Sequence, residues 1–105
     1  MRIGFIGCGN MATAMIKGIL DSQKAKTEDV IASAKSEKTR EKIKTELGIN
    51  AARKNKEVVE FSDILFLAVK PQYYEEVIQE IKDDIRENQM IVSIAPGKTL
   101  AWLAE

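Results

Sequence analysis

The sequence predicts an α/β protein built on a doubly wound parallel sheet of about five strands, in the order 3-2-1-4-5. Two observations carry this prediction. Apolar, strand-like runs alternate with amphipathic, helix-like segments along all 105 residues, a pattern that requires right-handed crossovers between parallel strands. The first strand also runs directly into the first helix through a short glycine-rich turn, GCGNMA.

The elements of the first half follow from apolar spacing and from residues that begin or end helices. Apolar side chains three and four residues apart indicate a first helix directly after the glycine turn. Ser36 is a suitable N-cap for the second helix, and Gly48 ends that helix after its buried residues Ile43 and Leu47. The expected segments are strands over residues 2–7, 29–33 and 49–52, and helical segments over 11–20, 37–47 and 55–60.

The second half contains the strongest strand signal. Residues 63–70, DILFLAVK, are almost continuously apolar, which is typical of a strand buried on both faces of a parallel sheet. A helix from Pro71 to about residue 86 and a second buried strand over 90–95 follow. A turn at Pro96 and Gly97 then precedes a helix that Thr99 caps. Because that helix is cut off at residue 105, we expect one domain, residues 1–105, truncated at its C-terminal end.

Composition excludes several classes of function. Lys plus Arg and Asp plus Glu number 16 each, so no net field favours nucleic acid or acidic membranes. No apolar run approaches the ~18 residues of a membrane span. The single cysteine indicates a reducing, cytoplasmic compartment. The absence of histidine removes the commonest general base and most zinc sites, so we predict no metal.

The glycine turn has the G-x-G-x-x-A form of a dinucleotide fingerprint, with Gly7, Gly9 and Ala12 at the defining positions. Gly7 permits a sharp exit from the strand, and Gly9 lets the backbone approach a pyrophosphate. The amides at the start of the helix would then bind anionic oxygens. The alternative is a plain strand-turn-helix corner. The position of the turn, in the first strand-helix unit of a Rossmann-type pattern, favours the cofactor interpretation.

The end of the second strand bears on the choice of nucleotide. NAD sites usually place an acidic residue there to bind the ribose hydroxyls, but this sequence has Ser33, Lys35 and Ser36, with Arg40 one turn further on. Hydroxyls, cations and a helix start suit a 2′-phosphate. We therefore predict a preference for NADPH, with NADH as the alternative cofactor. The competing interpretation is a solvated loop with a helix cap.

Three phrases together, GFIGCGNMATAMIKG, NKEVVEFSDILFLAVKPQ and IVSIAPGKT, resemble the N-terminal domain of pyrroline-5-carboxylate reductase. These enzymes complete proline synthesis by reducing the ring imine of 1-pyrroline-5-carboxylate with NADPH or NADH. The resemblance implies the same substrate and reaction for this chain. It also implies that a C-terminal helical domain, absent here, supplies the proton donor, most contacts to the substrate carboxylate and a homo-oligomeric interface.

The resemblance further implies the residues that would contact the cofactor, and it assigns no catalytic residue within the chain. Lys70 has two interpretations, as a support for the cofactor or the substrate carboxylate, or as the polar end of a strand. Pro96 departs from the family pattern and removes a backbone amide donor. The implied contacts are Ile6, Gly7, Gly9, Asn10 and Met11 at the pyrophosphate, Ser33, Ala34 and Lys35 at the adenosine ribose, Asn55 on the adenosine side, Ala68, Val69, Lys70 and Pro71 along the nicotinamide half, and Ser93, Ile94, Ala95 and Gly97 near nicotinamide and substrate.

Two other classes of function remain open. One is a related reductase or dehydrogenase with the same nucleotide module, such as a 3-hydroxyacid-type dehydrogenase, a coenzyme-F420-dependent NADP reductase or a competence-associated reductase homologue. The LAVKPQ phrase disfavours the first two of these. The other class is a non-enzymatic module that binds a nucleotide for sensing or regulation.

Overall fold

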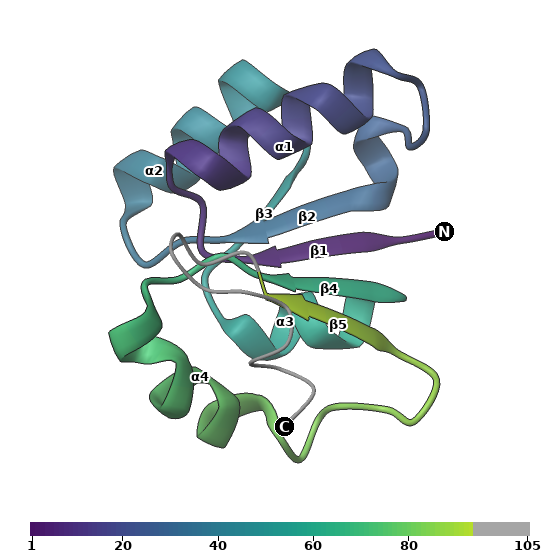
Figure 1. Ribbon diagram of the computed structural model, residues 1–105. Helices are drawn as coiled ribbons and strands as arrows, with labels where there is room; N and C mark the ends of the chain where they lie inside the picture. The colour runs from purple at the N-terminus through teal and green to yellow at the C-terminus, as the bar shows by residue number, and fades with distance from the viewer. Residues whose placement is uncertain (94–105) are drawn as a thin grey trace.

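The computed structural model describes residues 1–93, which form a parallel sheet of five strands between two layers of helices (Figure 1). The strand order is β3-β2-β1-β4-β5, and every neighbouring pair is parallel. The predicted fold class and strand order are therefore confirmed. The strands are β1 (Ile3–Ile6), β2 (Val30–Ser33), β3 (Asn50–Ala52), β4 (Ile64–Leu67) and β5 (Met90–Ser93).

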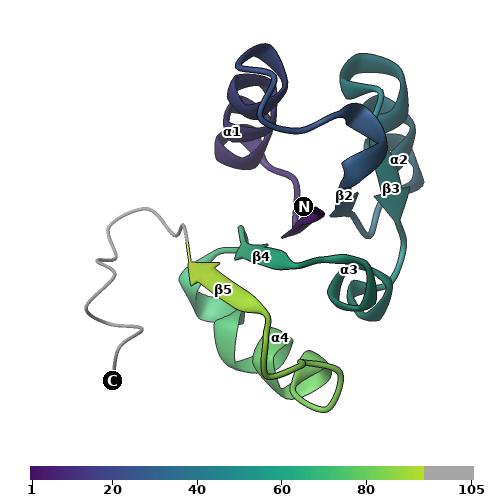
Figure 2. The ribbon, with the colours of Figure 1, turned by 90° about the vertical axis from the view of Figure 1, so that its right-hand side faces the viewer.

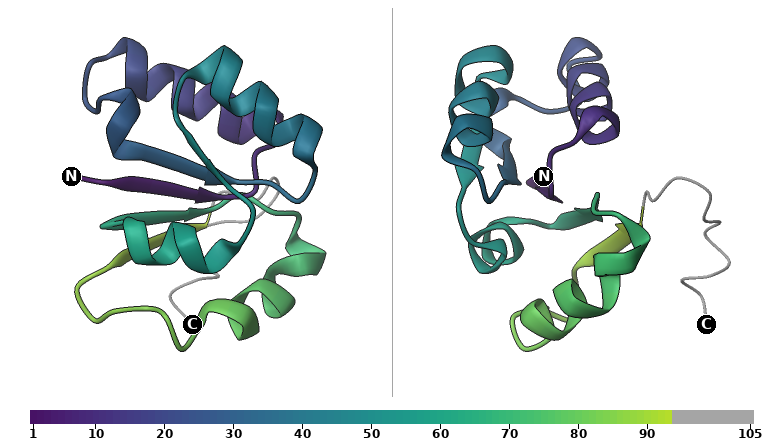
Figure 3. Two further views of the ribbon diagram at one scale, coloured as in Figure 1. Left: turned by 180° about the vertical axis from the view of Figure 1, so that it is seen from behind. Right: turned by 90° about the vertical axis from the view of Figure 1, so that its left-hand side faces the viewer.

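The helices cover the two faces of the sheet in sequence order, as the edge-on views show (Figures 2 and 3). The first crossovers place α1 and α2 on one face, and the later ones place α3 and α4 on the other. This division is what makes the sheet doubly wound. The helices are α1 (Asn10–Asp21), α2 (Glu37–Lys42), α3 (Asn55–Phe61) and α4 (Tyr74–Ile81), with short helical turns η1 (Thr27–Asp29), η2 (Ile43–Leu47) and η3 (Pro71–Tyr73).

The core consists of two apolar clusters separated by the sheet. Neighbouring residues of β1 face opposite sides, so Phe5 packs in the cluster under α1 and α2, whereas Ile6 packs in the cluster under α3 and α4. Phe5 pairs across the strands with Phe66, and the two rings stack with centroids 4.8 Å apart. On the other face, the hydroxyl of Tyr74 donates to the carbonyl of Leu67 and is hydrogen-bonded to Ser93, which fixes the start of α4 against the strand ends.

A close approach between β1 and α3 depends on Gly4. A Cβ at this position would overlap Ser62 Oγ and would lie 2.6 Å from Val58 Cγ1. Ser62 is completely buried, and its hydroxyl donates to the carbonyl of Val58 at 2.6 Å. Arg86 and Gln89 also donate to the carbonyl of Ser62, at 3.0 and 2.7 Å. The C-terminal end of α3 is therefore fixed against β1, and this holds the whole helix in place.

Several predicted segments differ from the structure in length or type. The strand predicted over 63–70 extends only over Ile64–Leu67, and the strand predicted to start at Asp29 starts at Val30 because η1 precedes it. The long helix predicted to reach residue 86 ends at Ile81, although Ile85 still packs against the core. The second helix begins at the predicted cap, where Ser36 Oγ accepts a hydrogen bond from the amide of Thr39, but its last turn is a π-helix, η2, that Gly48 ends at φ 70°.

The prediction that β5 is fully buried is wrong for the described residues. Met90 is 60% exposed, and the next three residues of the strand are half-buried. β5 lies at the edge of the sheet, where Ile91 packs against the cluster under α4. Apolar composition alone does not distinguish an edge strand from a central one. The predicted turn at Pro96 and Gly97 and the helix after Thr99 lie outside the described residues.

Candidate functional site

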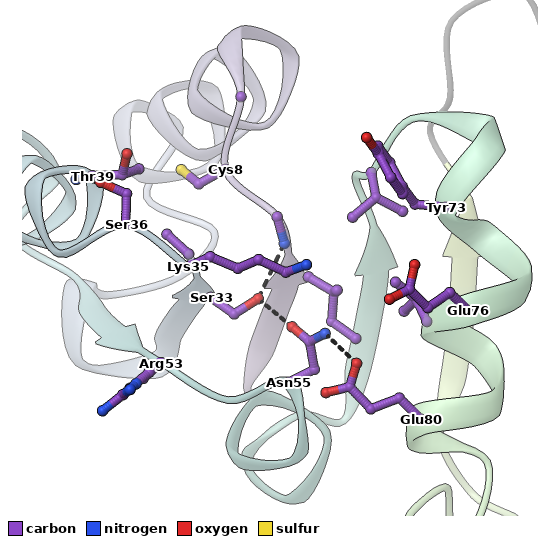
Figure 4. Close-up of a pocket in the computed structure, with 16 residues that line it drawn as sticks. Cys8, Ser33, Lys35, Ser36, Thr39, Arg53, Asn55, Tyr73, Glu76 and Glu80 are labelled. Carbon is purple, nitrogen blue, oxygen red and sulfur yellow. Dashed lines mark hydrogen bonds between the residues drawn. The ribbon is translucent and has the colours of Figure 1, made fainter.

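The carboxyl-terminal ends of the central strands surround a cavity of about 540 Å³ (Figure 4). This volume lies within the ~300–1,000 Å³ typical of small-molecule sites, and open parallel sheets bind ligands at this edge. The cavity is lined from the glycine turn, from the ends of β2 and β3, and from the start of α3 and one face of α4. The lining residues are Ile6, Gly7, Cys8, Gly9, Ser33, Ala34, Lys35, Ser36, Thr39, Arg53, Asn55, Val69, Tyr73, Glu76, Val77 and Glu80.

The two glycines of the turn are required for different reasons. Gly7 has φ +91°, and a Cβ there would lie 3.0 Å from the carbonyl oxygen of Ala68. Only glycine adopts that conformation without strain. Gly9 has an ordinary φ of −89°, and apart from its chain neighbours no atom of the described residues would lie within 4 Å of a Cβ there. The fold itself therefore requires Gly7, whereas Gly9 leaves open space at the mouth of the cavity.

The start of α1 lies beside this open space. Gly9 is the N-cap of α1 and provides no side-chain acceptor for the first-turn amides. The first intrahelical bond runs from the amide of Thr13 to the carbonyl of Gly9 at 3.0 Å. The amides before Thr13 have no carbonyl four residues earlier within the helix. Open space beside uncapped amides at the positive end of a helix suits the oxygens of a pyrophosphate. The residues present thus fit a dinucleotide.

A chain of hydrogen bonds connects the glycine turn to α4 across the floor of the cavity (Figure 4). The amide of Gly7 donates to Ser33 Oγ at 3.1 Å, and Ser33 Oγ donates to Asn55 Oδ1 at 2.7 Å. Asn55 Nδ2 in turn donates to Glu80 Oε2 at 3.2 Å. These bonds join four separate elements, so the positions of the turn, the end of β2, α3 and α4 depend on one another.

The hydrogen-bond chain includes Ser33, one of the residues predicted to contact the cofactor. The sequence predicts a hydroxyl that suits a 2′-phosphate, but Ser33 is 3% exposed and its one proton goes to Asn55. In this structure the Ser33 hydroxyl donates to Asn55 and not into the cavity. The Nη1 of Arg40 donates to the carbonyls of Ala34 and Lys35 at 2.8 and 2.9 Å and so shapes the loop. Lys35 and Ser36 remain as donors at the cavity wall.

The remaining predicted contacts are placed differently by the structure. Ile6, Ala34, Lys35 and Val69 line the cavity together with the residues already described. Ala68 is not among the lining residues: it packs under α1 and α2, and its amide donates to the carbonyl of Ile6 at 2.9 Å. Met11 is exposed, Lys70 follows β4 and Ser93 ends β5, and these three do not line the cavity either. Asn10 begins α1 and Pro71 begins η3. Three others named earlier, Ile94, Ala95 and Gly97, lie outside the described residues.

The residues that sequence reasoning missed lie mostly on the α4 side of the cavity. Tyr73, Glu76 or Val77, and Glu80 recur every three to four residues, which places them on one side of a helix. This spacing can be read from the sequence, but the sequence analysis used only the apolar residues of the helix, which identify its buried side and not the side that lines the cavity. Arg53 follows β3 and gives no sequence signal, because a lone surface arginine occurs at the end of many strands.

Cys8, the one cysteine of the chain, also lines the cavity. Burial raises the pKa of its thiol, and this effect exceeds the lowering by a hydrogen bond with Thr13, at 3.6 Å, and by the charge of Lys42. The thiol is therefore less reactive than an exposed cysteine.

The described residues were also searched for a metal centre and for a membrane-spanning helix. Within residues 1–93, no group of three or more His, Cys, Asp or Glu side chains is arranged to hold a metal ion. In the same range, no helix combines the length and apolar character needed to cross a membrane.

Comparison with models of protein families shows which family this domain belongs to. The family model described as NADP oxidoreductase, coenzyme F420-dependent, matches residues 2–97. The chain belongs to this family. Membership of the NADP oxidoreductase family agrees with the glycine turn and the open space at Gly9, because both occur where a dinucleotide-binding domain needs them.

Curated relatives match the same residues. Pyrroline-5-carboxylate reductase 3 of Danio rerio is 41% identical over 105 residues, which are 100% of this chain and 36% of that protein. Pyrroline-5-carboxylate reductase of Escherichia coli (strain K12) is 38% identical over 103 residues, 98% of this chain and 38% of that protein. The chain thus spans little more than a third of the length of these relatives. The resemblance inferred from the sequence phrases is confirmed.

Solved structures give the same result for the fold. A pyrroline-5-carboxylate reductase from Coxiella burnetii has a TM-score of 0.83 at 28% identity, and the match covers 93% of this chain and 36% of that chain. Pyrroline carboxylate reductase of Plasmodium falciparum, solved with NADP bound, has a TM-score of 0.81 at 26% identity, with 98% and 36% covered.

Proposed function

We propose that this chain binds NADP(H) in the cavity at the strand ends and forms the dinucleotide-binding part of an enzyme that reduces 1-pyrroline-5-carboxylate to proline. The observation that carries the proposal is the open space at Gly9 beside the uncapped start of α1. The relatives named pyrroline-5-carboxylate reductase and the NADP-bound structure from Plasmodium falciparum support the choice of substrate and cofactor.

The chain's own residues would then bind and orient the cofactor. The amides of the first turn of α1 bind the pyrophosphate, with room provided by Gly9. Lys35 and Ser36 line the cavity beside the end of β2 and would bind a 2′-phosphate on the adenosine ribose, and a charged donor there favours NADPH over NADH. When bound, the reduced nicotinamide supplies a hydride. The contribution of this domain to the reaction is to hold that ring in a fixed position.

Several expectations remain part of this proposal. The nicotinamide-side contacts Ala68, Val69, Lys70, Pro71, Ala95 and Gly97 belong to it, as does a homo-oligomeric assembly. A cytoplasmic location rests on the single cysteine. The substrate is a small molecule, and the balanced charge gives no reason to expect nucleic acid or a membrane as a partner.

A second candidate is hydride transfer between NADP(H) and coenzyme F420, built on the same nucleotide module. The description of the matching family names that coenzyme. The dinucleotide site would be the same in both cases, so the two functions differ in the second substrate.

Thermal melting with added ligands tests the proposal. NADPH should raise the melting temperature of the chain, NADH should raise it less at equal concentration, and coenzyme F420 alone should leave it unchanged. Because the resemblance assigns the proton donor to a C-terminal domain, we expect the 105-residue chain alone to be inactive. NADPH oxidation is then followed on a protein that carries this chain together with such a domain, with 1-pyrroline-5-carboxylate or with coenzyme F420 as acceptor. Oxidation with F420 only would support the second candidate. Melting that no dinucleotide alters would contradict both.

A further inference from the structure

We propose that a second cavity, between α1 and the segment formed by α2 and η2, binds a phosphate group, and that a phosphate held there opposes binding of the dinucleotide. This second cavity measures about 350 Å³ and adjoins the cavity at the strand ends. The first part of the proposal concerns a separate site and does not depend on the proposed function. The second part rests on the proposed function, because it assumes that a dinucleotide occupies the first cavity.

Two helical segments form the walls of the second cavity. Thr13 and Lys17 lie one turn apart on α1, and Thr39, Lys42 and Glu46 follow one another at helical spacing on the opposite wall. Figure 2 shows α1 and α2 side by side on the same face of the sheet. The volume lies within the ~300–1,000 Å³ of small-molecule sites, so the cavity has room for a phosphate ion or for a small phosphate ester.

The charged side chains of the second cavity favour an anion. Lys17 and Lys42 provide two ammonium groups against the single carboxylate of Glu46. Neither lysine forms an ion pair with a carboxylate of residues 1–93. The charge of Lys42 also acts inside the cavity, because it lowers the pKa of the Cys8 thiol, although burial outweighs this effect. An anion between the two lysines would therefore meet cations that no side chain already neutralises.

The hydroxyl of Thr39 adds a third donor. It makes no hydrogen bond to any of the described residues, whereas the Thr39 amide donates to Ser36 Oγ at 3.4 Å. Thr13 cannot serve in the same way, because its hydroxyl proton goes to the carbonyl of Gly9 at 2.9 Å. Two ammonium groups and one hydroxyl, placed on two different walls, match the three acceptor oxygens of a phosphate group. A carboxylate has only two oxygens, so the donors favour phosphate.

The two cavities meet at the glycine turn. Cys8, Gly9 and Thr39 line both of them, and Figure 4 shows the sulfur of Cys8 directed toward Thr39. A phosphate in the second cavity would thus lie next to the pyrophosphate that we assign to the space at Gly9. Two anionic groups at close range repel one another. Each ligand should therefore weaken the binding of the other by the same factor.

Alkylation of Cys8 tests the phosphate site without any dinucleotide. Cys8 is the one cysteine of the chain, so iodoacetamide reports on this cavity alone. Two charge-assisted hydrogen bonds correspond to a dissociation constant of about 1 mM. With about 10 mM inorganic phosphate, compared with sodium chloride at equal ionic strength, the rate of alkylation should fall about fivefold or more. A parallel experiment with glycerol phosphate distinguishes the free ion from an ester as the better ligand, and protection by either supports the site.

The double variant Lys17→Gln/Lys42→Gln should lose this protection. Each variant is compared with its own rate in chloride, because Lys42 itself affects the thiol. Lys44→Gln is the matched control, since it makes the same change at an exposed lysine of η2 that does not line the cavity. Lys35→Gln removes a cation that lines only the first cavity. Both of these single variants should remain protected.

Two results of the alkylation experiment would overturn the site. One is an alkylation rate of the unmodified chain that neither phosphate compound changes. The other is protection that Lys35→Gln abolishes and the double variant retains, because phosphate would then occupy the dinucleotide cavity.

Calorimetric titration with NADPH tests the opposition between the two ligands. Phosphate should weaken NADPH binding to the unmodified chain about fivefold and should leave binding to the double variant unchanged. Equal NADPH affinity of the unmodified chain with and without phosphate would overturn this part of the proposal. A smaller preference for NADPH over NADH in the double variant would overturn the separate site, because the 2′-phosphate of the cofactor would then occupy the second cavity. Failure of any dinucleotide to bind would overturn the proposed function, whereas protection of Cys8 by phosphate would still stand.

Discussion

Substitution of Gly4 by alanine should destabilise the domain far more than its size suggests. The added methyl group would overlap Ser62 Oγ and approach Val58 Cγ1 to 2.6 Å. Ser62 is completely buried. Its hydroxyl and its amide both donate hydrogen bonds, and its carbonyl accepts two. Neither neighbour can move into solvent, so the strain must be absorbed by β1, by α3, or by rotation of the Ser62 side chain.

The expected magnitude follows from these contacts. Overpacking a core costs about 1–3 kcal/mol. Rotating Ser62 away would also leave its buried hydroxyl without the Val58 carbonyl, at a further cost of about 1–3 kcal/mol. We therefore expect Gly4→Ala to lower the free energy of unfolding by roughly 3–5 kcal/mol, from a total that for natural domains is about 5–15 kcal/mol.

Urea unfolding followed by circular dichroism measures this change. Gly18→Ala is the matched control, because Gly18 lies within α1 with no atom near its Cβ position. That substitution should stabilise the domain by about 0.5–1 kcal/mol through helix propensity. Ser62→Ala in the Gly4→Ala background should recover part of the loss, since it removes the overlapping atom. A loss of less than about 1 kcal/mol for Gly4→Ala would refute the close packing of α3 on β1.

Three further predictions concern the cofactor loop, the half-buried thiol of Cys8 and the end of α3. Lys35→Glu should reduce or reverse the preference for NADPH over NADH, by about 10–100-fold if one charge-assisted contact is lost; equal affinities in the unmodified chain would contradict this. Cys8, whose pKa is raised by burial, should react with iodoacetamide at about pH 8 more slowly in the folded chain than in urea, and NADPH should slow it further. Because the pKa is raised, the folded state holds the thiol proton more tightly than the unfolded state does. The free energy of unfolding should therefore decrease as the pH rises through the range in which the Cys8 thiol titrates. Cys8→Ala should remove this contribution to the pH dependence. Arg86→Ala should cost about 1–3 kcal/mol in urea unfolding, because Arg86 donates to the carbonyls of Glu60 and Ser62 at 3.1 and 3.0 Å; an unchanged unfolding midpoint would show that Gln89 alone is sufficient.

Much of the fold could be predicted because its signals are local. The apolar run of β4, the cap at Ser36 and the left-handed stop at Gly48 each depend on a few neighbouring residues. The errors arose where tertiary contacts decide. Met90 has the composition of a core strand but lies on an edge. The helix after Pro71 ends at Ile81 although its apolar spacing continues to Ile85.

The candidate site was predictable to a similar degree. The glycine turn and the loop after β2 are recognisable from spacing, and the structure places both at one cavity. The role of Ser33 could not be derived from sequence, because its proton is taken by Asn55, 22 residues away. Glu80 was missed for the same reason. Its partner lies 25 residues away on another helix, and only the packing of α3 beside α4 brings the two together.

The most direct test of the central claim is a calorimetric titration of the Gly9→Val variant with NADPH. Within residues 1–93, a Cβ at residue 9 meets no atom within 4 Å apart from those of its chain neighbours, so the variant should fold as the unmodified chain does. The valine side chain would nevertheless occupy the space assigned to the pyrophosphate, and loss of two charge-assisted hydrogen bonds corresponds to about a hundredfold weaker binding or more. Gly18→Val, which also enters open space but on the body of α1, is the control and should bind NADPH like the unmodified chain. Undiminished NADPH affinity in folded Gly9→Val would contradict the assignment of this cavity as the dinucleotide site.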